Sequence, residues 1–218
     1  MCIRDRFTTS AFTNVQENQT VVGTAAATDA DGSSLTFTLA GAGADNALFN
    51  IASGGAITFK SAPDFETPLG GSSDNSNDYV IQVTATDGGS LTDTQTITIS
   101  VTNANEAPVI TNGDTDTANF VENATSTVID VAHSDVDSGD SIAYTLTGSV
   151  DDGLFNIVEG TGVITFKSAP DFETPLGGSS DNSNDYVIQV TATDGGSLTD
   201  TQTITISVTN VNLSLIHI

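Results

Sequence analysis

The feature that most constrains this chain is an internal repeat. Residues 57–103 recur without a single change at 164–210. Upstream of this segment the two copies have diverged but still align, since Glu17-Asn18 corresponds to Glu122-Asn123 and residues 48–51 correspond to 154–157. A self-similar period of roughly 105 residues predicts two structural units of one design rather than a single large domain.

The alignment of the two copies sets the expected boundaries. We expect the first repeat at residues 11–105 and the second at residues 106–212. Residues 1–10 are expected to be a flank outside the repeat, an artefact followed by a partial start, and residues 213–218 a tail that is not native. The ends MCIRDR and LSLIHI have no counterpart in the other copy and resemble translated adapter sequence. Cys2, the single cysteine, lies in the first flank, so no disulfide can form within the chain.

Apolar residues recur with a period of two. Tyr79, Ile81, Val83 and Ala85 alternate with polar residues, and Ile97, Ile99 and Val101 do the same one segment later. Such alternation is typical of half-buried strands, and the pairs Asp31-Gly32 and Gly54-Gly55 are turn signals between them. About seven short strands per repeat predict an all-β protein, with two tandem Greek-key antiparallel β-sandwich domains.

The charge balance excludes several partners. The chain holds 28 acidic and 4 basic residues, a formal net charge of −24. Binding to nucleic acid or to an anionic membrane needs a basic surface, so neither is an expected partner. No apolar run is long enough to span a bilayer, so we expect no direct insertion into a membrane.

Acidic residues gather at the ends of the expected strands. Each repeat carries, in order, a Glu-Asn pair, an Asp-x-Asp turn, an Asp-Phe-Glu triplet and an Ala-Thr-Asp-Gly strand end. A single Asp in a turn usually bonds nearby backbone amides, and this reading remains open for each Asp taken alone. We expect five further acids to be solvated loop or turn residues: Asp45, Asp74, Asp93, Asp151 and Asp152.

This order of motifs resembles the cadherin repeat, in the form found in large bacterial surface proteins. The resemblance covers residues 11 to 212 nearly throughout, and it includes the junction Asn103-Ala104-Asn105-Glu106-Ala107-Pro108. It implies Ca²⁺ as cofactor, bound between successive domains by carboxylates, amide oxygens and the linker. Oxygen ligands of this kind are those that calcium prefers. The implied ligands are Glu17, Asp64, Glu66, Asn103, Asn105, Glu106, Asp135, Asp137 and Asp194.

The resemblance also implies a partial metal half-site at each end of the chain. Seven carboxylates in the junction set would repel one another without cations, which supports calcium independently of the resemblance. The linker has Asn103 where the family usually has Asp and is one residue short, so two or three ions remain open. His133 is expected at the surface or in a turn rather than as a ligand, because calcium prefers oxygen. The half-site residues are Asp29, Asp31, Asp87, Glu122, Asp171 and Glu173.

We therefore expect a calcium-rigidified extracellular module that acts as a stalk or adhesion segment of a large bacterial surface or secreted protein. The expected location is the cell surface, and the expected partners are neighbouring repeats of the same chain, with a surface protein or glycan as a further partner. Two alternatives remain: a calcium-dependent carbohydrate- or protein-binding module, and a non-catalytic spacer of a secreted enzyme. We expect no enzymatic activity, because the paired acids lack the apolar pocket that a general acid needs.

Overall fold

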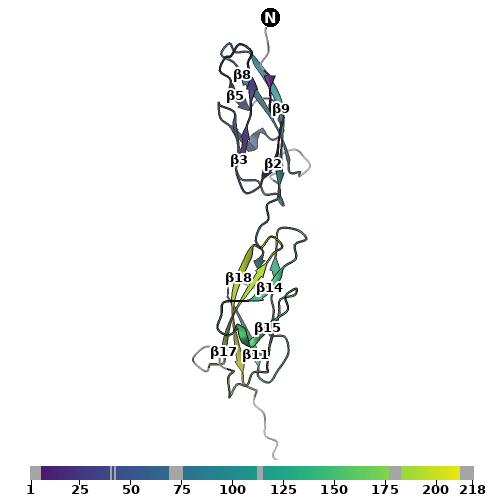
Figure 1. Cartoon of the computed structure of the whole chain (residues 1–218), viewed down its shortest axis with the longest axis vertical. Coiled ribbons are helices and arrows are strands. Elements are labelled where there is room, and N and C mark those ends of the chain that lie inside the picture. The colour runs from purple at the N-terminus through teal and green to yellow at the C-terminus, as the bar shows by residue number, and fades with distance from the viewer. Residues whose placement is uncertain are drawn as a thin grey trace, which may run out of the picture. The chain divides into compact units, whose positions relative to one another are not determined.

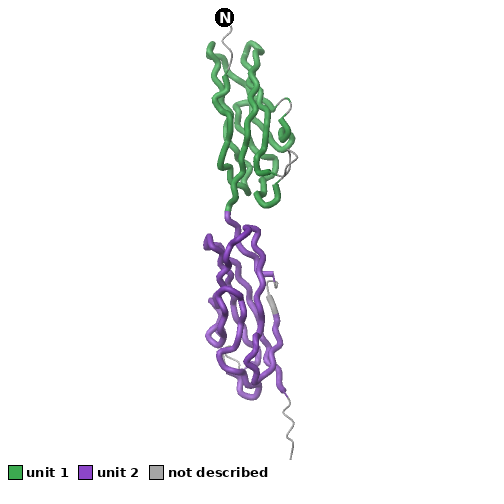
Figure 2. Tube along the Cα trace, turned by 90° about the vertical axis from the view of Figure 1, so that its right-hand side faces the viewer, with its two compact units in different colours: residues 1–104 green, residues 105–218 purple. Residues whose placement is uncertain are grey.

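The computed structural model describes residues 6–39, 41, 43–68, 76–111, 115–176 and 183–211. The chain forms two compact units, Met1–Ala104 and Asn105–Ile218 (Figure 2). Both are built from strands, with one short 3₁₀ turn described in each (Figure 1). The prediction of two tandem β-sandwich domains is confirmed.

Unit 1 consists of a four-stranded sheet in the order β2-β9-β8-β5, a three-stranded sheet in the order β3-β7-β6, and the short pair β1-β4. A 3₁₀ turn, η1 (Asn46–Leu48), precedes β6. The strands are β1 (Arg6–Phe7), β2 (Ala11–Gln16), β3 (Val21–Thr24), β4 (Ala27–Thr28), β5 (Thr36–Leu39), β6 (Phe49–Ile51), β7 (Ala56–Phe59), β8 (Asp78–Thr86) and β9 (Thr92–Thr102).

Unit 2 repeats this topology, with sheets in the orders β11-β18-β17-β14 and β12-β16-β15 and the pair β10-β13. Its 3₁₀ turn is η2 (Asp152–Leu154). The strands are β10 (Val109–Ile110), β11 (Thr115–Val121), β12 (Ile129–Asp130), β13 (His133–Ser134), β14 (Ala143–Leu146), β15 (Phe155–Ile157), β16 (Val163–Phe166), β17 (Asp185–Thr193) and β18 (Thr199–Thr209).

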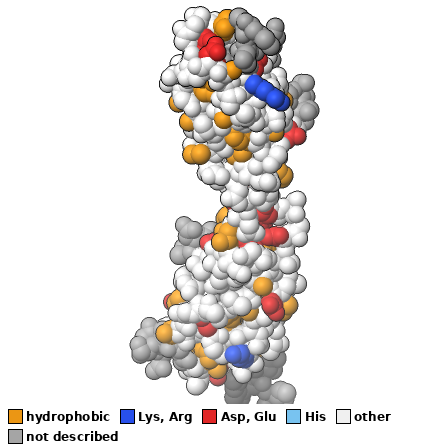
Figure 3. Space-filling view, turned by 45° about the horizontal axis from the view of Figure 1, so that its top comes forward, with side chains coloured by type: hydrophobic (Ala, Val, Ile, Leu, Met, Phe, Trp, Pro, Cys, Tyr) orange, Lys and Arg blue, Asp and Glu red, His pale blue; other side chains and the backbone are white. Residues whose placement is uncertain are grey.

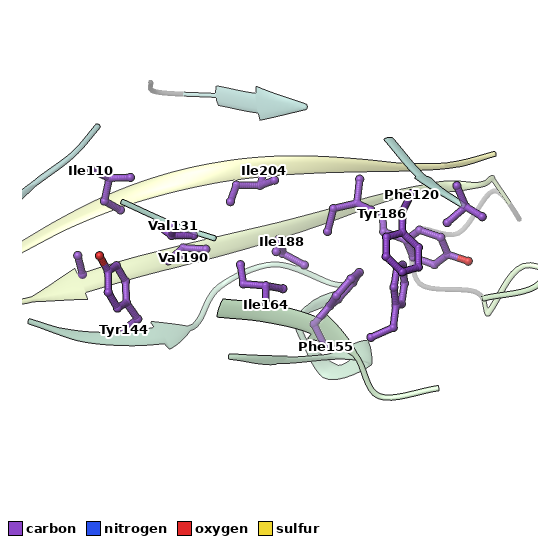
Figure 4. Close-up of a cluster of buried hydrophobic side chains, with 14 of the residues drawn as sticks. Ile110, Phe120, Val131, Tyr144, Phe155, Ile164, Tyr186, Ile188, Val190 and Ile204 are labelled. Carbon is purple, nitrogen blue, oxygen red and sulfur yellow. The ribbon is translucent and has the colours of Figure 1, made fainter. Parts of the chain in front are cut away.

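The core of each unit lies between its two larger sheets and follows the period-two pattern. In β8, Tyr79, Ile81, Val83 and Ala85 are at most 1% exposed, whereas the residues between them are half-buried. Figure 4 shows the same arrangement in unit 2, where Ile164, Ile188 and Ile204 lie between aromatic side chains at both ends of the core. Burial of these alternating residues is the main stabilising contribution to each sandwich.

One strand pairing in each unit is parallel. β2 pairs in parallel with β9, and β11 pairs in parallel with β18, whereas the other pairings are antiparallel. The first long strand of each unit, β2 or β11, therefore runs in the same direction as the last strand, β9 or β18. In unit 1 the register of β2 shifts between Phe12 and Val15, where Asn14 has a φ of 62°.

The short strand β1 lies within the ten residues that the repeat alignment places in the flank. Phe7 is 9% exposed, and its ring contacts that of Phe37 at a centroid distance of 6.0 Å. Its counterpart in unit 2 is Ile110, which is also buried. The repeat alignment did not detect this match because Phe7 and Ile110 share hydrophobicity but not identity.

Two acids that were expected to be solvated are buried instead. Asp45 is 1% exposed and accepts a hydrogen bond from the nitrogen of Val80 at 2.6 Å, and Asp151 is 0% exposed and accepts one from Val187 at 2.8 Å. The pairing of β5 with β8 ends at Val83, and that of β14 with β17 ends at Val190. The two carboxylates accept hydrogen bonds from backbone nitrogens of β8 and β17 that lie beyond these ends. The prediction was wrong for both acids, because a position in a turn does not reveal whether a strand distant in sequence packs against the side chain. Asp74 lies outside the described residues.

Candidate metal centre

A buried glutamate organises the end of unit 1. Glu17 follows β2 and is 3% exposed. Its Oε2 accepts a hydrogen bond from the nitrogen of Phe65 at 2.6 Å, and its Oε1 accepts one from the nitrogen of Ala104 at 2.9 Å. Glu17, Asp64 and Glu66 each offer a carboxylate oxygen within 4.8 Å of the other two. The Glu-Asn motif, the Asp-Phe-Glu triplet and the chain after β9 thus meet at one place.

The other two acids of this group are exposed and are fixed by local contacts. Asp64 accepts a hydrogen bond from the nitrogen of Thr67 at 2.7 Å. Glu66 accepts one from the side-chain amide of Asn103 at 2.8 Å. Four of the nine predicted ligands, Glu17, Asp64, Glu66 and Asn103, therefore lie together in unit 1.

Unit 2 repeats the arrangement at its own far end. Glu122 is 4% exposed and accepts hydrogen bonds from the nitrogens of Phe172 at 3.1 Å and Val211 at 2.7 Å. Its carboxylate groups with those of Asp171 and Glu173 within 4.8 Å, and Asn210 donates to Glu173. The predicted half-site of Glu122, Asp171 and Glu173 is thus brought together as its counterpart is in unit 1.

The start of unit 2 gathers the remaining predicted ligands. The side-chain amide of Asn105 donates to Asp194 at 2.8 Å, and the backbone nitrogen of Glu106 donates to Asp137 at 2.8 Å. Asp194 is 6% exposed and Asp137 is 9% exposed. The residues that open unit 2 therefore cover the Asp-x-Asp turn and the strand-end Asp.

A further acid, Asp140, lies in this group and was not predicted. Asp135, Asp140 and Asp194 offer carboxylate oxygens within 4.8 Å of one another. Oδ2 of Asp135 is buried and has no hydrogen-bond partner among the described residues, while its Oδ1 accepts from the nitrogen of Asp137 at 3.0 Å. Asp140 has no acidic counterpart in the first repeat, where the corresponding segment is one residue shorter and contains only Gly32, Ser33 and Ser34, so the repeated motifs did not reveal it.

The corresponding acids of unit 1 are arranged differently. The carboxylate of Asp29 accepts hydrogen bonds from the backbone nitrogens of Asp31 at 3.0 Å and Ser33 at 2.7 Å. The carboxylate of Asp87 accepts one from the backbone nitrogen of Leu91 at 2.7 Å. Asp31 is exposed, and Asp29 and Asp87 are half-buried. Among the residues that the structure describes, these three acids do not form a group of the kind found around Asp135.

The donor set suits a hard cation. The groups consist of carboxylates with asparagine amides beside them, and calcium binds six to eight oxygens of these types. The two lysines of the repeats point elsewhere: Lys60 donates to the carbonyl of Ala47 at 2.6 Å, and Lys167 to that of Gly153 at 2.7 Å. The side-chain NH₂ groups of Asn103 and Asn105 each face a carboxylate. A rotation of either amide by 180° would present its oxygen to a cation instead.

His133 lies on the surface, next to this group in sequence. It is exposed, in β13, and its Nδ1 lies 2.6 Å from the hydroxyl of Tyr144. Burial of Tyr144, with a smaller contribution from the charge of Asp130, raises the pKa of its hydroxyl above the usual value. The contact ties β13 to β14 and gives His133 a structural partner.

One face of the molecule shows how charged side chains are distributed over part of the surface. On the face in Figure 3, acidic side chains form small groups among polar side chains and backbone, and basic ones are few. In the described part of the chain, no helix has the length and hydropathy needed to cross a membrane.

Comparison with known proteins gives a different family model for each unit. A family model of the cadherin domain matches residues 116–209, and one of a bacterial Ig domain matches residues 5–100. The protocadherin-like wing polarity protein stan of Drosophila melanogaster is 35% identical over 145 residues. That match covers 62% of this chain and 4% of the fly protein, so the chain spans a small part of its relative.

Solved structures show the same fold. Domains EC1-2 of human protocadherin-24 superpose with a TM-score of 0.64 and 20% identity, covering 96% of this chain and 99% of that one. Domains EC1-4 of Drosophila N-cadherin superpose with a TM-score of 0.61 and 21% sequence identity, and the match covers 95% of this chain and 50% of that one. At this identity the likeness concerns the fold. The chain therefore consists of two tandem β-sandwich domains with the fold of cadherin ectodomains, and the second of them also matches the cadherin family model.

Proposed function

We propose that this chain is a calcium-stabilised extracellular repeat module that serves as a stalk or adhesion segment of a larger bacterial surface or secreted protein. The observation that carries the proposal is the pair of buried glutamates, Glu17 and Glu122, each bonded to two backbone nitrogens and each grouped with two exposed acids. Repetition of this arrangement in both units favours a ligand that every repeat binds.

Charge supports the same conclusion. Bringing three carboxylates within 4.8 Å is repulsive unless a cation or a proton compensates. Lys60 and Lys167 bond carbonyls elsewhere, so they do not supply that charge. A divalent cation with oxygen ligands does, and the buried Oδ2 of Asp135, which lacks a described partner, is a ligand of the required type.

The linker carries ligands for both units. Ala104, whose nitrogen bonds Glu17, is followed directly by Asn105 and Glu106, which bond Asp194 and Asp137. We propose that calcium ions bound along this segment are shared by Glu17, Asp64, Glu66 and Asn103 before it and Asn105, Glu106, Asp135, Asp137 and Asp194 after it. Shared ions would restrict bending at the linker, which is what an extended stalk requires.

Half-sites at the two ends are proposed to bind calcium more weakly, because fewer protein oxygens leave more of the coordination to water. They comprise Glu122, Asp171 and Glu173 at one end, and Asp29, Asp31 and Asp87 at the other. Extracellular location and an adhesive role follow from the family rather than from any one residue, and the partner is a neighbouring repeat or a cell-surface molecule.

The test uses two acids that lie in identical local sequence. Asp64→Asn is expected to abolish the tightest phase of calcium binding in calorimetry, whereas Asp171→Asn is expected to leave it nearly unchanged. Equal losses would show that each unit binds calcium by itself, and the shared site would be wrong. Absence of any calcium response in the unmodified chain would overturn the calcium proposal as a whole.

A further inference from the structure

The two units contain an identical hairpin. β8 and β9 have the same sequence as β17 and β18, residue for residue. Each hairpin forms the middle of its four-stranded sheet, and it pairs in the same register with β5 or β14 on one side. On the other side the pairing with β2 is interrupted, whereas that with β11 is continuous. It also provides most of the residues that are at most 4% exposed in its unit: Tyr79, Ile81, Val83, Ala85, Ile97, Ile99 and Val101, with their counterparts in unit 2.

The strands that pack on this hairpin differ between the units, and their differences offset one another. In unit 1 the space beside the hairpin is filled by Phe7, Phe37 and the small Ala25. In unit 2 the corresponding residues are Ile110, Tyr144 and the larger Val131. Loss of volume at one position is matched by gain at another within the same half, which preserves packing. Two different N-terminal halves thus fit one hairpin.

We propose that each hairpin can fold into either unit, so that a second copy of this chain is captured by strand exchange between unit 1 of one molecule and unit 2 of the other. Strand β5 can pair with either hairpin, because the two hairpins have the same sequence. Thr38 of β5 pairs with Thr84 of β8 in the native fold, and Thr191 of β17 is the residue identical to Thr84. An exchanged unit has the same core contacts as a native one, and tandem repeats are prone to such misassembly.

The linker disfavours the same exchange within one molecule. If β8–β9 replaced β17–β18, Thr102 would take the place of Thr209, while Ile110 bonds Asp200 near the start of β18 at 2.8 Å. The chain would have to return from Thr102 to a point beside Asp93, about 30 Å away along a nine-residue strand segment. The eight residues from Thr102 to Ile110 reach about 26–29 Å when fully extended. A linker that must be fully extended, or slightly beyond, makes exchange between separate molecules the favoured route.

The experiment detects a contact that only exchange between units creates. The full chain carrying Cys2→Ser, Thr38→Cys and Thr191→Cys is unfolded in denaturant, refolded at low and at high concentration, and oxidised with oxidised glutathione. In the native fold the two cysteines belong to different units. After exchange between molecules they lie opposite each other, so we expect disulfide-linked dimers and larger species that increase with concentration and exceed the control several-fold.

The matched control is Cys2→Ser with Thr38→Cys and Thr205→Cys, because residue 205 pairs with β17 and β11 and would not lie opposite β5 after exchange. Linking in the control as strong as in the test variant would overturn the proposal. A disulfide within one monomer of the test variant would overturn the role of the linker. As a second readout, Thr38→Cys chains with a donor dye and Thr191→Cys chains with an acceptor dye are refolded together. Absence of energy transfer in the resulting oligomers would also overturn exchange.

Discussion

The carboxylate of Glu17 lies 2.6 Å from the backbone nitrogen of Phe65, between the two acids Asp64 and Glu66 that flank this phenylalanine. Glu122 makes the same contact with Phe172 in unit 2. One buried side chain thus orients the loop that carries two exposed acids, and it does so through neutral amides. The contact makes Glu17 part of the fold as well as a proposed ligand.

This double role can be separated by measurement. Glu17→Ala removes the acceptor for two backbone nitrogens, each of which costs about 1–3 kcal/mol when left unsatisfied. We expect the free energy of unfolding of unit 1, measured by urea denaturation in EDTA, to fall by about 2–4 kcal/mol. Asp64→Asn, at an exposed position, should change it little under the same conditions. Similar losses from both variants would contradict the structural role of Glu17.

Asp140 gives a prediction whose sign depends on calcium. Asp140→Ser, which introduces a residue type that the first repeat has in this segment, removes one of three neighbouring carboxylates. In EDTA we expect the melting temperature of unit 2 to stay the same or rise slightly, because like charges no longer repel. In calcium titrations we expect the affinity of the group for calcium to fall several-fold. Asp78→Ser, which removes an exposed acid outside the groups, is the charge-matched control, and an equal effect from it would exclude Asp140 as a ligand.

Asp45 is expected to be among the more sensitive acids of unit 1. Asp45→Ala leaves the nitrogen of Val80 without its acceptor and empties a buried site, so a loss of about 2–4 kcal/mol in unfolding free energy is expected. Asp45→Asn retains an acceptor oxygen and should cost less. Asp93→Ala is the comparison, because the carboxylate of Asp93 accepts a hydrogen bond from the nitrogen of the adjacent Thr94, at 2.9 Å. Circular dichroism during urea titration measures all three, and equal stability of Asp45→Ala and Asp93→Ala would contradict the assignment.

Because of Tyr144, we expect the free energy of unfolding of unit 2 to fall more at alkaline pH than that of unit 1. Its pKa is raised in the folded state, mainly by burial, so the unfolded chain releases the phenolic proton first. The stabilisation is complete below about pH 10, the unfolded value, and is lost as pH rises through the folded value. Unit 1 has Phe37 at this place and lacks this step. Tyr144→Phe should remove the difference between the units in alkaline thermal melts; a difference that persists would assign it to another group.

The strands were predictable because alternation is a local property. Tyr79–Ala85 and Ile97–Val101 reveal a buried face without reference to other residues, and the internal duplication indicates two units. Pairing direction is a different matter. Alternation is the same in parallel and antiparallel strands, so the parallel contact of β2 with β9 could not be derived from it.

The candidate site was predictable only where a motif repeated. Glu17 and Glu122 share a motif, and the structure places them alike, whereas Asp140 occurs in one copy and was missed. Burial of Asp45 and Asp151 depends on a strand more than thirty residues away in sequence, so a turn signal alone misled the prediction. Whether the predicted acids bind calcium remains a proposal that the mutants above address.

The parallel pairing of the first and last long strands has a mechanical consequence. When a unit is pulled by its two ends, β2 is drawn towards one end and β9 towards the other, so their hydrogen bonds are sheared together instead of opening one at a time. In unit 2 this contact runs without interruption from Thr115–Thr203 to Val121–Thr209, whereas in unit 1 it is interrupted between Phe12 and Val15. Under tension, unit 1 is therefore expected to yield first, and unit 2 to hold the greater force.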